Sequence, residues 1–220
     1  MAAWAYQRRY RISRRRHAID RVRQLFARAL GYSLGESALD YGISARARMG
    51  ACDPPRLLFL HGTTWPSKHW PEPYWAELAH MAAAEGYEVL LPWGDPGDRL
   101  LAERVIGAAQ AGELLPRSGL TELARLLAAS AGVVGVDSGL AHLAAAVGVP
   151  AITLYGPTQS ALTGALGPAQ RNLGADFECA PCVRRECDYA GESPVKPACF
   201  AHLDPQTVWA ALRGQMEAAR

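Results

Sequence analysis

The chain has 220 residues, half of them hydrophobic and a fifth charged, with a formal net charge of +2. This balance excludes global disorder, because so many apolar residues can build a core that offsets the entropy of ordering the chain. No apolar run approaches the ~20 residues of a membrane-spanning helix. The first residues also lack the apolar stretch of a secretory signal, so we expect a cytoplasmic protein.

The N-terminal segment is strongly basic. Residues 1–28 contain nine arginines and a single acid, Asp20. Such concentrated charge indicates an anionic partner, namely nucleic acid, anionic lipid headgroups or an acidic glycolipid, although a solvated helix face is an equal alternative. Apolar residues between Ile19 and Leu30 recur at three- and four-residue steps, which predicts a helix over 1–31 that ends at Gly31.

A linker rich in Gly, Ser, Pro and charges is predicted over 32–55, and short apolar runs then alternate with helical spacing. Strands are predicted at 56–61, 87–92, 113–115, 133–136 and 151–155. Helices are predicted at 74–85, 98–109, 121–129, 139–147 and 205–218. This alternation predicts an α/β fold with a doubly wound, mostly parallel sheet. In such sheets ligands bind beyond the carboxyl ends of the strands.

The loop after the first predicted strand reads HGTTWPSK, residues 61–68. Its hydroxyls, on Thr63 and Thr64, donate hydrogen bonds, and Lys68 adds a positive charge, so the loop suits phosphate oxygens. A polar surface turn is the alternative for this loop taken alone.

A second loop, DSGLAH over 137–142, lies between a strand and a helix. Amides at a helix start are unpaired and the helix dipole favours an anion there. Gly139 lets the backbone approach a ligand closely. The sequence has neither G-x-G-x-x-G nor a Walker A pattern. Ser138, Gly139 and His142 are therefore candidates for a diphosphate site that needs no metal, and a plain N-cap by Asp137 or Ser138 is the alternative.

A third loop, PWGDPGD over 92–98, is rich in Pro and Gly. Trp93 is a candidate to pack on a flat base, and Asp98 is a candidate acceptor for a ribose or sugar hydroxyl. A simple turn, with Asp98 capping the next helix, is the favoured local alternative.

Four of the five cysteines form the pattern C-x2-C-x4-C-x11-C, at Cys179, Cys182, Cys187 and Cys199. Four cysteines match the ligand count of a structural zinc site, although the spacing is not that of a standard finger. A cytoplasmic location argues against disulfides, and unligated thiols remain an equal alternative. No metal is assigned to catalysis.

Three segments of the chain together resemble the lipopolysaccharide heptosyltransferases, most closely the heptosyltransferase I group. They are LLFLHGTTWPSKHWPEPYW, VLLPWGDPGD and VVGVDSGLAHLAAAVGVPAITLYGPT, within residues 56–158. The resemblance implies a GT-B fold of two Rossmann-like domains, of which this chain supplies the C-terminal one. Residues 51–220 would be the donor-binding domain with a Cys-rich loop over 179–199. Residues 1–50 would be a helical remnant of the acceptor domain and the interdomain linker.

The resemblance also implies the reaction, an inverting transfer of L-glycero-D-manno-heptose from ADP-L-glycero-β-D-manno-heptose to Kdo2-lipid A in the lipopolysaccharide inner core. It implies no cofactor, no nucleic-acid partner, and a peripheral place on the inner face of the inner membrane. Lys68 would stabilise the leaving diphosphate. The implied donor contacts are Thr63, Thr64, Lys68, Asp98 (where the family more often has Glu), Ser118 (main chain, to adenine), Asp137, Ser138, Gly139, Leu140 and His142.

One departure from the family concerns catalysis. The N-terminal half of these enzymes binds the acceptor and supplies an Asp general base, so no catalytic base is assigned in this chain. We expect a truncated donor-binding half. A catalytically silent nucleotide-sugar-binding module and a different ADP- or UDP-sugar donor stay open. A nucleic-acid-binding protein ranks last, because the basic segment lacks interleaved aromatic residues.

Overall fold

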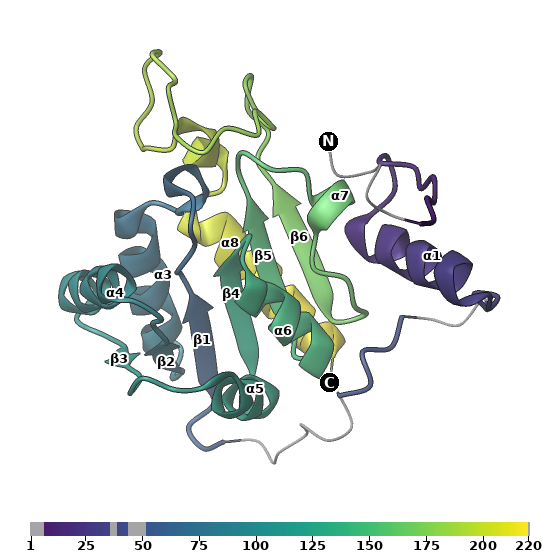
Figure 1. The fold of residues 1–220 in the computed structure, drawn as a ribbon. Helices are drawn as coiled ribbons and strands as arrows, with labels where there is room; N and C mark the ends of the chain where they lie inside the picture. The colour runs from purple at the N-terminus through teal and green to yellow at the C-terminus, as the bar shows by residue number, and fades with distance from the viewer. Residues whose placement is uncertain (1–6, 36–38, 44–51, 220) are drawn as a thin grey trace.

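The computed structural model describes residues 7–35, 39–43 and 52–219. Its centre is a sheet of six parallel strands in the order β3-β2-β1-β4-β5-β6 (Figure 1). This order confirms the predicted doubly wound α/β fold. The strands are β1 (Arg56–Leu60), β2 (Glu88–Leu91), β3 (Glu113–Leu114), β4 (Gly132–Val136), β5 (Ala151–Tyr155) and β6 (Gln170–Gly174).

Helices cover both faces of the sheet (Figure 1). Helices α5 and α6 pack on one face, and α3 and α8 pack on the other, where α4 lies beside α3. The helices are α1 (Ala18–Leu30), α3 (Glu72–Ala84), α4 (Pro96–Ala109), α5 (Leu120–Ala129), α6 (Gly139–Val147), α7 (Ser160–Thr163) and α8 (Pro205–Ala218). Two 3-10 helices, η2 (Pro66–Lys68) and η3 (Ala198–His202), complete the described elements.

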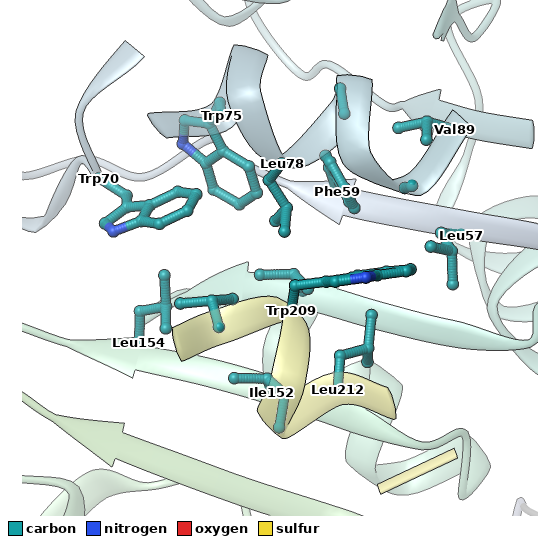
Figure 2. Close-up of a cluster of buried hydrophobic side chains, with 14 of the residues drawn as sticks. Leu57, Phe59, Trp70, Trp75, Leu78, Val89, Ile152, Leu154, Trp209 and Leu212 are labelled. Atoms are coloured by element: carbon teal, nitrogen blue, oxygen red, sulfur yellow. The ribbon is translucent and has the colours of Figure 1, made fainter. Parts of the chain in front are cut away.

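Strand β1 shows why its sequence is a continuous apolar run. Successive side chains of a strand point to opposite faces, and both faces of this sheet are covered. Leu57 and Phe59 therefore join the core beneath α3 and α8, whereas Leu58 and Leu60 join the core beneath α5 and α6. Figure 2 shows the first of these cores, in which the ring of Phe59 lies near that of Trp75.

The predicted helix over 1–31 is too long. Helix α1 begins only at Ala18, and the described residues before it, 7–17, form no helix. The arginine-rich stretch offers few apolar side chains to bury, and the ring of His17 accepts a hydrogen bond from the amide of Ile19 at the helix start. Gly31 ends the helix in the left-handed conformation, φ 75°, as predicted. Residues 1–6 lie outside the described residues.

The predicted linker contains no helix or strand in its described parts, 32–35, 39–43 and 52–55; the rest of it is not described. The described N-terminal residues contact the sheet domain near α7. The ring of His17 hydrogen-bonds the carbonyl of Gly164 at 3.0 Å, and the hydroxyl of Tyr41 donates to the carbonyl of Leu166 at 3.0 Å. The division at residues 50 and 51 stays a prediction. No helix within the described ranges has the length and apolar character to cross a bilayer.

Candidate functional site

The candidate site lies between β1 and β4, where the strand order of the parallel sheet reverses. Strands β1 and β4 are neighbours, and the chain leaves them toward opposite faces, so the loops after them diverge and open a crevice. A cavity of about 870 Å³ lies there, a size typical of small-molecule sites. It is lined by Tyr41, Gly62, Thr63, Thr64, Lys68, Asp95, Asp98, Leu120, Asp137, Ser138, Gly139, Leu140, His142, Leu143 and Ala146.

Nine of the ten predicted donor contacts line this one cavity. The exception is Ser118, whose hydroxyl donates to the carbonyl of Pro116 at 2.9 Å, while Leu120 reaches the cavity instead. Two lining residues that the sequence analysis missed, Leu143 and Ala146, lie four and seven positions after Gly139 on the same face of α6, a spacing that could have revealed them. Tyr41 carried no such signal, because it lies in the predicted linker.

An ion pair joins two of the three loops. The ammonium of Lys68 lies 2.8 Å from Oδ2 of Asp137, and both side chains are largely buried. The same oxygen accepts a hydrogen bond from the hydroxyl of Thr158 at 2.7 Å. Because an ammonium has three protons to donate, Lys68 can remain paired with Asp137 and still bind an anion in the cavity.

The start of α6 is open to the cavity. Ser138 precedes the helix, but its side chain makes no capping hydrogen bond, so it is not a plain N-cap. Its hydroxyl is buried and has no hydrogen-bond partner among the described residues, which costs free energy unless a ligand pairs with it. Apart from its chain neighbours and the backbone of α6, no atom of the described residues lies within 4 Å of the position that a Cβ on Gly139 would occupy. The unpaired amides and the helix dipole therefore favour an anion here.

The carboxylate of Asp98, in the first turn of α4 just after the third loop, also lines the cavity. It accepts a hydrogen bond from the amide of Gly94 at 3.2 Å, whereas Asp95 caps α4, so the interpretation of Asp98 as the cap is wrong. A Cβ on Gly62 would lie 2.8 Å from both oxygens of Asp98. A larger residue at position 62 would therefore push this carboxylate out of its place beside the loop after β1. Trp93 does not line the cavity, and its indole donates to the carbonyl of Leu115 at 2.8 Å.

Burial keeps two histidines near the cavity, His69 and His142, uncharged. It lowers the pKa of His142, against an opposing effect of Asp137, and it lowers the pKa of His69. Both rings are therefore neutral near pH 7, and His142 offers the cavity a hydrogen bond rather than a full charge.

These lowered pKa values predict that acid destabilises the fold. An unfolded histidine titrates near pH 6.5, so below about that pH the unfolded chain binds more protons than the folded chain does. The stability should be complete above about pH 6.5 and should fall as the pH drops toward the folded pKa values. Melting temperatures should therefore decline between about pH 7.5 and pH 5.5, and the decline should be smaller in His142→Gln. An equal decline in both proteins would contradict the assignment of neutral His142.

Comparison with known proteins identifies relatives over most of the chain. A family model described as glycosyltransferase family 9 (heptosyltransferase) matches residues 1–192. Lipopolysaccharide heptosyltransferase 1 of Pseudomonas aeruginosa is 43% identical over 98% of this chain and 64% of its own length. The structure of the E. coli heptosyltransferase WaaC with ADP superposes with a TM-score of 0.71 at 40% identity, over 79% of this chain and 55% of that one. WaaC with ADP-2-deoxy-2-fluoro heptose gives 0.66 at 38%, over 78% and 54%.

The chain thus spans between half and two thirds of the length of these relatives. Within that span, the three loops around the cavity fall inside the region matched by the family model.

Proposed function

The chain belongs to glycosyltransferase family 9, the heptosyltransferases, and we propose that its central cavity binds ADP-heptose for heptose transfer to the lipopolysaccharide inner core. One observation carries this proposal. The buried ammonium of Lys68, the open start of α6 and the unpaired hydroxyl of Ser138 all line one cavity. These are the groups that a diphosphate requires, namely positive charge and hydrogen-bond donors.

The relatives support the choice of nucleotide and sugar. The two E. coli WaaC structures named above contain ADP and an ADP-heptose analogue. In this chain the diphosphate would lie between Lys68 and the amides of α6, with His142 as a further donor. The carboxylate of Asp137 would accept hydrogen bonds from heptose hydroxyls, and Thr63, Thr64, Asp98 and Leu140 would complete the contacts. A main-chain contact from Ser118 to adenine stays a prediction.

The proposed chemistry is an inverting displacement. A hydroxyl of the acceptor attacks the anomeric carbon of heptose, the bond from that carbon to the diphosphate oxygen breaks, and a base takes the hydroxyl proton. Negative charge grows on the departing ADP. Lys68 and the dipole of α6 lie where they would stabilise this charge, so we propose that the transfer needs no metal or other cofactor.

The test of this proposal is a calorimetric titration of the purified chain with ADP, AMP and ADP-heptose. We expect ADP to bind more tightly than AMP, because the second phosphate adds charge and acceptors for Lys68 and α6. ADP-heptose should bind at the same site and compete with ADP. Absence of ADP binding at millimolar concentration, or equal affinity for ADP and AMP, would overturn it.

A catalytically silent nucleotide-sugar-binding role is the second candidate. It is favoured by the described cavity, whose residues supply charge, hydroxyls and amides for a donor, while the resemblance assigns none of them as the general base. A transfer assay with ADP-heptose and Kdo2-lipid A distinguishes the two roles. Heptose transfer would support the enzyme, whereas donor binding without any transfer would support the silent role.

The positive charge of the basic N-terminal segment supports the proposal that the acceptor lies at a membrane surface. Of its nine arginines, seven are exposed, namely Arg8, Arg9, Arg11, Arg14, Arg15, Arg16 and Arg28. Kdo2-lipid A is polyanionic, and juxtaposed arginines attract anionic headgroups. We therefore propose it as the acceptor, with the protein bound peripherally on the inner face of the inner membrane.

Vesicle binding tests this membrane proposal. The chain should co-sediment with vesicles that contain anionic lipid and not with purely zwitterionic ones, and the binding should weaken as salt is raised. Replacing Arg14, Arg15 and Arg16 together with glutamine should lower the affinity by about 100-fold, at roughly 1 kcal/mol per arginine. Binding that is absent, or insensitive to salt, would refute the proposal.

A further inference from the structure

The four cysteines of the predicted zinc site line a second cavity, of about 470 Å³, which is separate from the donor cavity. Cys179 and Cys187 are exposed, Cys182 is half-buried and Cys199 is buried. No three His, Cys, Asp or Glu side chains of the described residues are placed to share an ion. The zinc site therefore stays a prediction, whereas a buried histidine beside the donor cavity has polar contacts that the structure does place.

This histidine is His61, which directly follows the apolar run of β1 and is completely buried. Burying an imidazole costs free energy unless its nitrogens are paired. Here both nitrogens face an oxygen: Nδ1 lies 3.2 Å from the carbonyl oxygen of Phe59, and Nε2 lies 2.9 Å from that of Asp98. The ring also lies edge-on to Trp75, with centroids 6.4 Å apart. The imidazole is thus fixed by contacts on several sides.

The ring of His61 joins two of the three loops around the donor cavity. It follows β1, whereas Asp98 lies in the first turn of α4, which follows β2. An imidazole with a single N–H can donate to only one of the two carbonyls. The contact with Asp98 is the shorter, and 2.9 Å is the usual length of an N–H···O bond, so the geometry favours a proton on Nε2.

Both the backbone and the side chain of Asp98 are held in place. His61 contacts its carbonyl, and the amide of Gly94 donates to its Oδ2 at 3.2 Å. The loop that begins with His61 also passes close to the carboxylate, since a Cβ on Gly62 would lie 2.8 Å from both oxygens. Asp98 lines the donor cavity and His61 does not. The buried ring can therefore act on a ligand only through the groups that it holds.

We propose that His61 is a positioning residue, which donates from Nε2 to the carbonyl of Asp98 and so holds the carboxylate where it accepts a hydrogen bond from a hydroxyl of the nucleotide-sugar donor. The inference rests on the proposed function, because it takes the central cavity to be the donor site. Without this bond the first turn of α4 loses an attachment to the end of β1, and the carboxylate can move from its place. A hydrogen bond weakens steeply as its geometry is lost.

The first experiment is a double-mutant cycle on the affinity for ADP-heptose, measured by calorimetry well below the melting temperatures. Asp98→Ala removes the carboxylate but keeps the carbonyl that His61 contacts, and it should weaken binding about tenfold or more. His61→Phe keeps a ring without a donor and should weaken binding about three- to tenfold. In the Asp98→Ala background the same change should cost less than about twofold, because no carboxylate is left to position.

Equal losses in the two backgrounds would overturn the proposal, since His61 would then act on the fold and not through the carboxylate of Asp98. Two single variants test the donated proton. His61→Gln places an amide N–H near the position of Nε2 and should regain most of the affinity that His61→Phe loses. A glutamine variant as weak as the phenylalanine variant would contradict the hydrogen bond to Asp98.

His80→Phe is the matched control at the other end of α4. Nδ1 of the exposed His80 lies 3.3 Å from the carbonyl oxygen of Ala109, the last residue of that helix. The variant removes a comparable contact far along the chain from the cavity lining, so it should leave the affinity for ADP-heptose unchanged. A loss equal to that of His61→Phe would overturn the proposal, because any loosening of α4 would then have the same effect.

The second experiment uses the unmutated chain, so it does not depend on a variant that folds. Nitrogen NMR of the ring of His61 should show a proton on Nε2, and this proton should exchange slowly with water because the ring is buried. An Nε2 without a proton would overturn the proposal even if ADP-heptose binds. A chain that binds neither ADP nor ADP-heptose would overturn the donor site itself, and the role of His61 with it.

Discussion

Replacing Lys68 with methionine should weaken ADP binding by about 10- to 100-fold, since a hydrogen bond to a charged group contributes about 1.5–3 kcal/mol. Two effects combine in this variant. The diphosphate loses its cation, and the buried carboxylate of Asp137, 2.8 Å from the ammonium in the unmodified chain, is left to repel it. Methionine keeps most of the length of the side chain, so the change is mainly one of charge. Calorimetry with ADP measures the effect.

Two further variants separate these effects. Lys196→Met removes the same charge from an exposed position that does not line the cavity, and it should leave ADP affinity unchanged. Adding Asp137→Asn to Lys68→Met removes the uncompensated carboxylate, so the double variant should recover part of the lost affinity. If Lys68→Met binds ADP as tightly as the unmodified chain, the diphosphate does not lie at this ammonium.

The sequence predicted the position of the site better than its internal contacts. Parallel strands bring their carboxyl ends to one edge, so loops that follow β1, β2 and β4 had to lie near one another whatever their detailed conformation. Pairing between side chains depends on distances that no local pattern encodes. The ion pair between Lys68 and Asp137, and the hydrogen bond from Thr158 to the same carboxylate, became visible only in the structure.

The elements of the fold were likewise predicted where burial leaves a pattern in the sequence and missed where it does not. The buried strands β1, β4 and β5 were predicted because burial on both faces requires continuous apolar runs. Strand β6 was missed, since at the edge of the sheet its sequence, QRNLG, contains a single large apolar residue. The start of α5 was predicted one residue late: the helix begins at Leu120, after Gly119, which makes no side-chain cap. Such a start carries no side-chain signal in the sequence.

Replacing Trp75 with alanine should cost about 3–5 kcal/mol of folding free energy, the usual range for a fully buried large aromatic side chain. Its ring is completely buried and lies edge-on to Trp70, with centroids 4.9 Å apart, and at 5.4 Å from Phe59 (Figure 2). Through these contacts it joins α3 to β1 and to the segment before α3. The cavity left behind would be lined by side chains that other contacts hold in place, so little of it can collapse.

Thermal denaturation should show this loss as a fall of about 6–20 °C in melting temperature, at 2–4 °C per kcal/mol for a chain of this size. Leu100→Ala truncates a mostly exposed side chain on α4, so it should change the free energy of unfolding by no more than about 0.5 kcal/mol. A Trp75→Ala protein as stable as Leu100→Ala would show that the aromatic cluster does not support the core.

The Trp75→Ala variant also tests how far ADP binding at the site depends on packing in the core. Trp70, which contacts Trp75, donates its indole hydrogen to the carbonyl of Leu203 at 2.8 Å and comes two residues after Lys68. Well below its melting temperature, Trp75→Ala should therefore bind ADP only a few times more weakly than the unmodified chain, because Lys68 keeps its pairing with Asp137. A loss as large as that of Lys68→Met would mean that the packing of Trp70 and Trp75, more than the ion pair, positions the ammonium.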